Sequence, residues 1–124
     1  MIYLDTHVLV RLYQGDTEKL TDTVRREIEH HDLLVSPAAV LELEYLHEIG
    51  RLHTDALKIM EALAADLSAK VCGIPFRQIV EQALEEKWSR DPFDRLIVAH
   101  AKAGDAALIT KDENIRRHYT RAVW

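Results

Sequence analysis

The chain has 124 residues, of which 48% are hydrophobic and 30% charged, and its 21 acidic side chains against 16 Lys and Arg give a formal net charge of −5. A chain of this length and composition forms one globular domain, here residues 1–124. The negative charge argues against broad, non-specific binding to nucleic acid, although it leaves binding along one basic face open.

Four further features concern compartment and chemistry. No stretch is apolar for the length of a membrane span, and the first residues lack the basic and apolar regions of a secretory signal. Cys72 is the only cysteine and lies in an apolar run, so we expect a buried, unreactive thiol and no internal disulfide. The seven histidines show no pair at the helical spacing of zinc ligands, and we interpret them as surface or helix-capping residues. These features predict a cytoplasmic protein that does not associate with membranes.

The first third of the chain alternates between strand and helix. Residues 2–4 form a short apolar run that ends at Asp5, and apolar residues at helical spacing follow up to Gly15. A second helix is predicted over residues 18–31, capped by Asp16 or Thr17. Residues 33–35 are predicted to form the second strand.

The third helix begins at Ser36 and Pro37 and reaches about residue 49, and its acids fall on two faces. Glu44 and Glu48 share a charged face that we predict to be solvated, whereas Glu42 has apolar neighbours at helical spacing. Glu42 is therefore either a partly exposed acid at the edge of the apolar stripe or a functional residue.

The middle of the chain continues the alternation. A fourth helix is predicted over residues 55–66, a third strand over 69–72 and a fifth helix over 76–88. The inward-facing residues of the fourth helix are predicted to be Leu57, Met60, Leu63 and Ala64. Residues 121–124 are a plausible last edge strand.

The stretch from Asp91 to Gly104 reads as a helix with one unusual residue. Asp91 is a good N-cap, Pro92 a good first helical residue, and Gly104 is expected to supply a left-handed exit, so the helix spans residues 92–103. Asp94 lies on its buried stripe. An unpaired buried charge is costly, so Asp94 either pairs with an arginine such as Arg90 or Arg95, or supplements the helix start, or binds a metal.

A buried strand, residues 106–109, follows this helix and is succeeded by the polar residues Thr110 and Asp112. Asp112 can also cap a short helix that reaches residue 118. Strands alternating with helices predict a parallel, doubly wound sheet, in which ligands bind outside the carboxyl ends of the strands. Asp5 and Asp112 both lie at that edge.

Four acids at one edge would require a cation. If Glu42 and Asp94 point to the same edge, the four carboxylates repel one another unless a divalent ion holds them, and oxygen ligands suit Mg²⁺ or Mn²⁺. Such ions serve hydrolytic phosphoryl transfer. Two other acidic-site folds fit less well: a receiver domain needs an acid after the third strand, where this chain has Gly73-Ile-Pro75, and a haloacid dehalogenase needs Asp-x-Asp, where this chain has Asp5-Thr6-His7.

Four segments together resemble the PIN-domain ribonucleases, and look most similar to the VapC-type toxins of toxin-antitoxin modules. They are residues 4–6 (Leu-Asp-Thr), 36–43 (Ser-Pro-Ala-Ala-Val-Leu-Glu-Leu), 91–101 (beginning Asp-Pro-Phe-Asp-Arg) and 108–112 (Leu-Ile-Thr-Lys-Asp). The resemblance implies a PIN-like three-layer α/β/α fold with a four- or five-stranded parallel sheet. The chain departs from it at Ser89, where this branch often has His.

Carried over residue by residue, the resemblance assigns the catalytic and metal-binding roles to the four acids Asp5, Glu42, Asp94 and Asp112. Thr6 and Thr110 would be supporting hydroxyls around them, and Asp91 the structural cap. The resemblance also implies Mg²⁺- or Mn²⁺-dependent cleavage of single-stranded RNA, inhibition by a cognate antitoxin protein, and a homodimer.

Two other functions stay open on the sequence alone: a PIN-like nuclease of RNA processing or defence, and a non-catalytic metal- or RNA-binding module with the same fold. For the homodimer, apolar residues near helix ends are the candidate contacts, namely Leu12, Tyr13 and Leu52.

Overall fold

The computed structural model describes residues 1–124, and its strands form one fully parallel sheet in the order β3-β2-β1-β4-β5. The strands are β1 (Ile2–Leu4), β2 (Leu33–Val35), β3 (Lys70–Val71), β4 (Ala107–Ile109) and β5 (Ala122–Val123). The helices are α1 (Thr6–Gln14), α2 (Asp22–His30), α3 (Pro37–Glu48), α4 (Ala56–Leu67), α5 (Phe76–Ala83), α6 (Pro92–Ala103) and α7 (Glu113–His118), and a 3-10 turn, η1, spans Thr17–Lys19.

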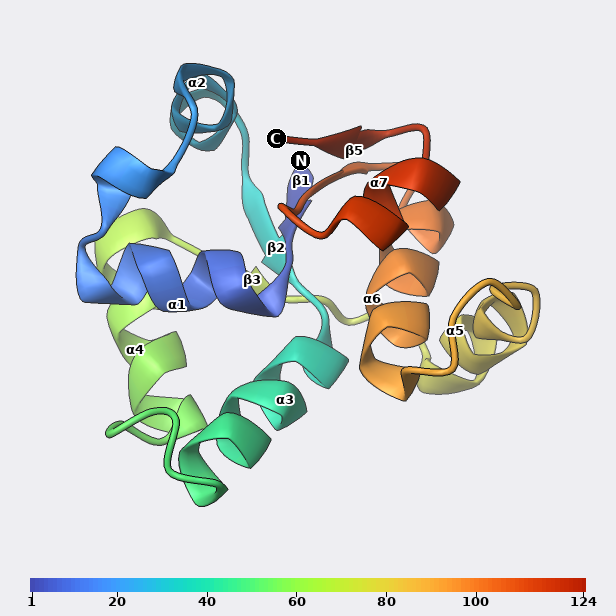
Figure 1. Cartoon of the computed structure of the whole chain (residues 1–124), viewed down its shortest axis with the longest axis horizontal. Coiled ribbons are helices and arrows are strands. Elements are labelled where there is room, and N and C mark those ends of the chain that lie inside the picture. Colours follow the sequence, from blue (N-terminus) through green and yellow to red (C-terminus); the bar gives the residue numbers. More distant parts are fainter.

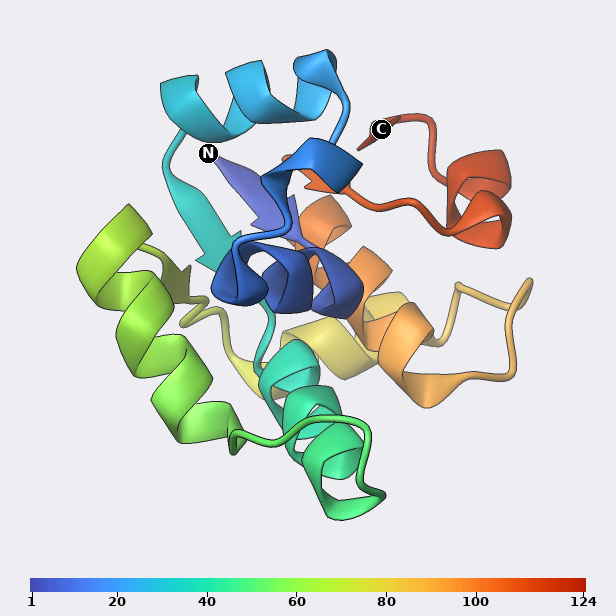
Figure 2. The ribbon, with the colours of Figure 1, turned by 60° about the vertical axis from the view of Figure 1, so that its left-hand side comes forward.

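The helices cover both faces of the sheet. Figure 1 shows α1, α2 and α4 on one side of the strands and α5 and α6 on the other. Figure 2, turned by 60°, shows α1 lying in front of β1 and β2. The predicted three-layer α/β/α architecture is confirmed, with five strands. No helix combines the length and the apolar character that crossing a membrane requires.

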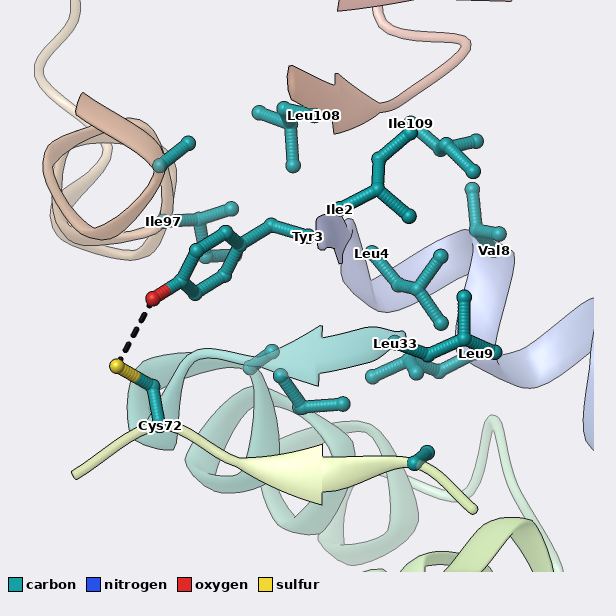
Figure 3. Close-up of a cluster of buried hydrophobic side chains, with 14 of the residues drawn as sticks. Ile2, Tyr3, Leu4, Val8, Leu9, Leu33, Cys72, Ile97, Leu108 and Ile109 are labelled. Atoms are coloured by element: carbon teal, nitrogen blue, oxygen red, sulfur yellow. Dashed lines mark hydrogen bonds between the residues drawn. The ribbon is translucent and has the colours of Figure 1, made fainter. Parts of the chain in front are cut away.

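The core is built around β1, the central strand, whose three residues are each 1% exposed. The Tyr3 hydroxyl donates to Sγ of Cys72 at 2.8 Å (Figure 3), and burial raises the pKa of Tyr3 well above its ordinary value. Cys72 is buried, as predicted. Gly104 packs closely on Tyr3, because a Cβ there would lie 3.1 Å from the Tyr3 ring, tighter than an ordinary van der Waals contact.

The predicted left-handed exit at Gly104 is wrong. Gly104 has φ −84°, and the left-handed residue is the next one, Asp105, at φ 49°. The helix itself ends at Ala103 as predicted. Asp105 can adopt this backbone because short polar side chains tolerate the left-handed region better than most residues do.

Three helices differ from their predicted bounds or faces. The segment predicted to begin α2 is the turn η1, and α2 begins later because the Thr21 hydroxyl caps it by accepting from the Val24 N–H at 3.2 Å. In α4, Leu57 is 76% exposed and Ala64 is also exposed, whereas Ile59 takes the inward position. The helix predicted to reach residue 88 ends at Ala83.

The early end of α5 has a packing reason. Glu86, only 1% exposed, accepts from the Trp88 indole N–H at 2.6 Å and pairs with the ammonium of Lys102 at 2.5 Å. The Trp88 ring in turn stacks on His118. These contacts fix the segment between α5 and α6 outside any helix.

His100 contradicts the prediction that all histidines are surface or capping residues. Its side chain is 1% exposed, and Nδ1 lies 2.8 Å from Oγ of Ser36 and 3.0 Å from the carbonyl oxygen of Leu96. Burial lowers the pKa of His100, so the ring stays neutral. Because Ser36 caps α3, this contact ties the start of α3 to α6.

Candidate active site

Asp5 is the most firmly held acid of the site. It follows β1 directly, and its backbone N–H donates to the Ile109 carbonyl in β4 at 3.0 Å. Its Oδ1 accepts from the Thr6 N–H at 2.8 Å, and its Oδ2 accepts from the Thr110 hydroxyl at 2.6 Å. The side chain is 6% exposed, so both oxygens have a fixed orientation.

Thr110 connects Asp5 to Asp112. Its fully buried hydroxyl donates to Asp5 and accepts from the Asp112 N–H at 3.1 Å, while Oδ1 of Asp112 caps α7 through the Ile115 N–H at 2.9 Å. Thr6 behaves differently. Its Oγ1 is buried without a partner of normal hydrogen-bond geometry, although the hydroxyl lies near enough to Glu42 to favour the charged form of that acid.

Asp94 lies at the start of α6, one turn after the pocket-facing cap residue Asp91. Oδ1 of Asp91 accepts from the N–H groups of Phe93 and Asp94 at 2.8 and 3.3 Å, which confirms its predicted capping contact. The alternative of an ion pair for Asp94 is not what the structure shows. Arg95 donates to the Ala83 carbonyl and Arg90 to backbone carbonyls, and neither pairs with Asp94.

The four predicted acids line one pocket of about 410 Å³, to which α1, α3 and α6 contribute side chains together with residues that follow β1, β4 and β5. Glu42 reaches it from α3 and is partly buried. Four other polar or aromatic residues line the pocket, and no local sequence pattern indicated them. These are His7, Arg11, Lys111 and Trp124.

The electrostatics of the pocket favour an added cation. Burial raises the pKa of Asp5, of Glu42 and of Asp94, and for Asp94 the nearby charges of Asp91, Asp5, Asp112 and Glu42 add to burial and raise the pKa to about 7. None of these acids forms a salt bridge with a basic side chain. Clustered carboxylates without a counter-ion are the arrangement that a divalent cation stabilises.

The donor set fits a hard cation that keeps part of its water shell. Every predicted ligand is a carboxylate, and oxygen donors are what Mg²⁺ and Mn²⁺ prefer. No group of three or more Asp, Glu, His or Cys side chains is placed to hold an ion directly. Mg²⁺ usually binds through one or two carboxylates and completes its octahedron with water and substrate phosphate oxygens, so it does not need three protein ligands.

Comparison with known proteins gives matches over nearly the whole chain. Residues 2–120 match the PIN domain family model. The chain is 31% identical over 121 residues to Ribonuclease VapC22 of Mycobacterium tuberculosis, covering 94% of this chain and 91% of that protein.

Two solved structures share the fold. A toxin-antitoxin complex from Klebsiella pneumoniae gives a TM-score of 0.70 at 17% identity, covering 100% of this chain and 97% of that one. VapBC2 from Rickettsia felis, bound to a DNA fragment from its promoter, gives 0.67 at 18% identity, covering 94% and 92%.

Proposed function

The chain belongs to the PIN-domain family, among the VapC-type ribonucleases, and from this membership we propose that its acidic pocket hydrolyses phosphodiester bonds of single-stranded RNA with Mg²⁺ or Mn²⁺. Residues 1–124 act as one domain in this proposal. The observation that carries it is the set of four carboxylates in one pocket with no basic partner.

The four acids would hold the ion, and their side chains differ in how firmly the structure fixes them. Asp5 is fixed by Thr110 and the Thr6 N–H and defines one ligand position, whereas Asp112 offers the oxygen that does not cap α7. Glu42 and Asp94 supply negative charge from two different helices. When bound, the ion would activate a water molecule and stabilise charge on the phosphate.

The same proposal covers partners and compartment. The protein acts as the toxin of a toxin-antitoxin module, a small cognate antitoxin covers the pocket, and two copies form a homodimer. An antitoxin segment carrying Arg or Lys would replace the charge of the metal among the carboxylates. Cellular RNA as the substrate places the protein in the cytoplasm.

The test is cleavage of an unstructured RNA by the purified protein with Mg²⁺, with and without excess EDTA. Glu42→Gln should abolish cleavage and leave the fold intact, because the substitution keeps the shape and removes a charge from a repelling cluster. Glu48→Gln on the same helix is the matched control, since Glu48 is exposed and makes no hydrogen bond or ion pair.

Glu44 is unsuited as that control, because its placement on a purely solvated face is contradicted: its Oε1 accepts from the Ala56 N–H at the start of α4 at 3.1 Å. The proposal predicts activity in the wild type and in Glu48→Gln only, and only with the metal. Undiminished cleavage in EDTA, or by Glu42→Gln, would refute it.

A further inference from the structure

One side of the acidic pocket carries an aromatic ring with two cations over it. The ring belongs to Trp124, which follows the edge strand β5. The guanidinium carbon of Arg11, from α1, lies 5.4 Å from a ring centroid of Trp124, and Nζ of Lys111, from the end of β4, lies 6.0 Å from one. All three residues line the pocket that holds the four acids.

The positions of the two cations are unexpected on electrostatic grounds. Lys111 is adjacent in sequence to Asp112, and Arg11 lines the same pocket as five carboxylates, yet neither forms a salt bridge with any acid. The Arg11 guanidinium instead contacts the Trp124 ring and the Lys19 carbonyl at 3.5 Å. The ring thus provides an alternative partner that keeps both positive charges away from the carboxylates.

We propose that Arg11 and Lys111 form a binding site for a backbone phosphate of the RNA, next to the scissile one, and that Trp124 is the positioning residue that holds them there. This inference rests on the proposed function. Phosphate contacts set the register of a strand without reading its sequence, and a guanidinium beside an ammonium suits such an anion. A chain of net charge −5 needs such a local basic element to hold a polyanion at an acidic pocket.

The same arrangement leaves the acids free. Without the Trp124 ring, the side chain of Arg11 or Lys111 would pair with the carboxylates of the pocket and compete there with Mg²⁺. Trp124 therefore affects two measurable quantities, the affinity for RNA and the affinity for the metal. Because both cations lie over the ring, we assign Trp124 to holding them and not to stacking a nucleobase.

The first experiment measures the salt dependence of RNA binding in the Asp94→Asn background, which prevents cleavage, with a fluorescently labelled single-stranded RNA. Arg11→Gln and Lys111→Gln should each reduce the slope of log affinity against log salt by about 0.7, the value for one phosphate contact on a single strand. Trp124→Leu should reduce this slope by more than either Gln substitution does. Trp124→Phe should keep most of the wild-type slope, because a Phe ring also attracts cations. Arg77→Gln is the control, since Arg77 is 92% exposed on α5 and pairs only with Glu81.

The second experiment measures metal binding by the rise of melting temperature with Mn²⁺ concentration, in the parent chain without RNA. Trp124→Leu should require a higher Mn²⁺ concentration than the parent to reach half of the full rise in melting temperature. Adding Arg11→Gln and Lys111→Gln to Trp124→Leu should restore the lower concentration, because no released cation remains. A purely structural role for Trp124 would not give this restoration. In cleavage assays, the two single Gln variants should raise KM for RNA more than they lower kcat.

The outcomes separate this inference from the proposed function. Wild-type cleavage together with unchanged salt slopes in Arg11→Gln and Lys111→Gln would overturn the phosphate site alone. If Trp124→Leu binds RNA more weakly but leaves the salt slope unchanged, Trp124 stacks on a base. That result would also overturn the phosphate site. Absence of cleavage by the wild type refutes the ribonuclease proposal, while the slopes still decide the phosphate site. If Trp124→Leu does not fold, the salt slopes of Arg11→Gln, Lys111→Gln and Trp124→Phe decide the outcome.

Discussion

Asp91 and Asp94 lie three residues apart at the start of α6, and their surroundings give them different tasks. Asp91 is exposed and accepts two backbone N–H groups, whereas Asp94 is partly buried among like charges. Asp91→Ala should cost about 0.5 to 2 kcal/mol of stability through the lost cap, while the folded fraction keeps much of its activity.

Asp94→Asn should show the opposite behaviour. The substitution preserves shape and removes a repelling charge, so the metal-free variant should melt at the same temperature as the parent or higher, with cleavage almost lost. Thermal melts without metal and cleavage with Mg²⁺ measure both. If Asp94→Asn instead unfolds the protein while the folded remainder still cleaves RNA, then the role of Asp94 is structural.

The raised pKa of Asp94 also makes stability depend on pH. Its ordinary pKa is 3.8 and its folded value without metal is about 7, so between these pH values the folded state holds a proton that the unfolded state has released. The free energy of unfolding therefore falls as the pH rises through this window. Denaturant titrations of metal-free protein between pH 5 and about 8 should show this decline, and Asp94→Asn should flatten it. With Mg²⁺ the decline should shrink, because metal and proton compete for the carboxylates.

At the scale of elements, His100 joins the two helices that bring Glu42 and Asp94 to the pocket. Its contacts with Ser36 and the Leu96 carbonyl are buried, so His100→Leu should leave polar atoms unsatisfied and cost about 1 to 3 kcal/mol. Cleavage per folded molecule should fall as well, since the helix starts lose their mutual constraint. His53→Leu, at an exposed loop position, is the control. Equal chemical-denaturation midpoints for the two variants would contradict this role.

The sequence was sufficient for elements whose ends carry strong local chemistry. The Asp91-Pro92 start of α6, the Ser36-Pro37 start of α3 and the Asp112 cap of α7 were all predicted and are confirmed. It was insufficient where two local interpretations compete. Asp16 and Thr17 resemble a helix start, but Thr21 is the residue that caps α2.

Tertiary partners explain the other differences. The spacing within α3 predicts a solvated face for Glu44, because the Ala56 N–H group that donates to its carboxylate belongs to the next helix. His100 was misread because its partner Ser36 lies 64 positions away. Glu42 and Asp94 were assigned to the site by the resemblance, whereas Asp5 and Asp112 could be predicted from the alternation of strands and helices to lie at one edge of the sheet. Arg11 and Trp124 could not, because their relation to the pocket depends on cross-chain contacts that no local pattern indicates.

For the whole molecule, the exposed apolar residues add candidate contacts for the proposed homodimer to those that the sequence predicts. Of the three predicted contact residues, Leu12 and Leu52 are partly buried against the core, whereas Tyr13 is 38% exposed. Large exposed groups lie on α5, where Phe76 is 61% exposed, and on the neighbouring helices α3 and α4, where Leu41 is 62% and Leu57 is 76% exposed. Such residues on neighbouring helices favour self-association.

Leu41→Glu and Leu57→Glu should therefore shift the protein toward monomer in sedimentation at micromolar concentration, without lowering the melting temperature of the monomer. Leu84→Glu, at a 58% exposed position directly after α5, is the control for a second apolar surface. A wild-type protein that is monomeric at that concentration, or a dimer broken only by Leu84→Glu, would contradict this assignment.

The central place of β1 in the sheet has a consequence for the order of folding. Asp5 is synthesised 105 positions before Thr110, whose hydroxyl orients it, and β1 gains its second neighbour only with β4. A growing chain that has not yet exposed β4 can neither close the sheet around β1 nor orient Asp5. Contacts of such long sequence separation form late and slowly. The carboxylate pocket is therefore assembled only after the segment through Asp112 has been synthesised, and a nascent chain that stops before β4 lacks the complete site.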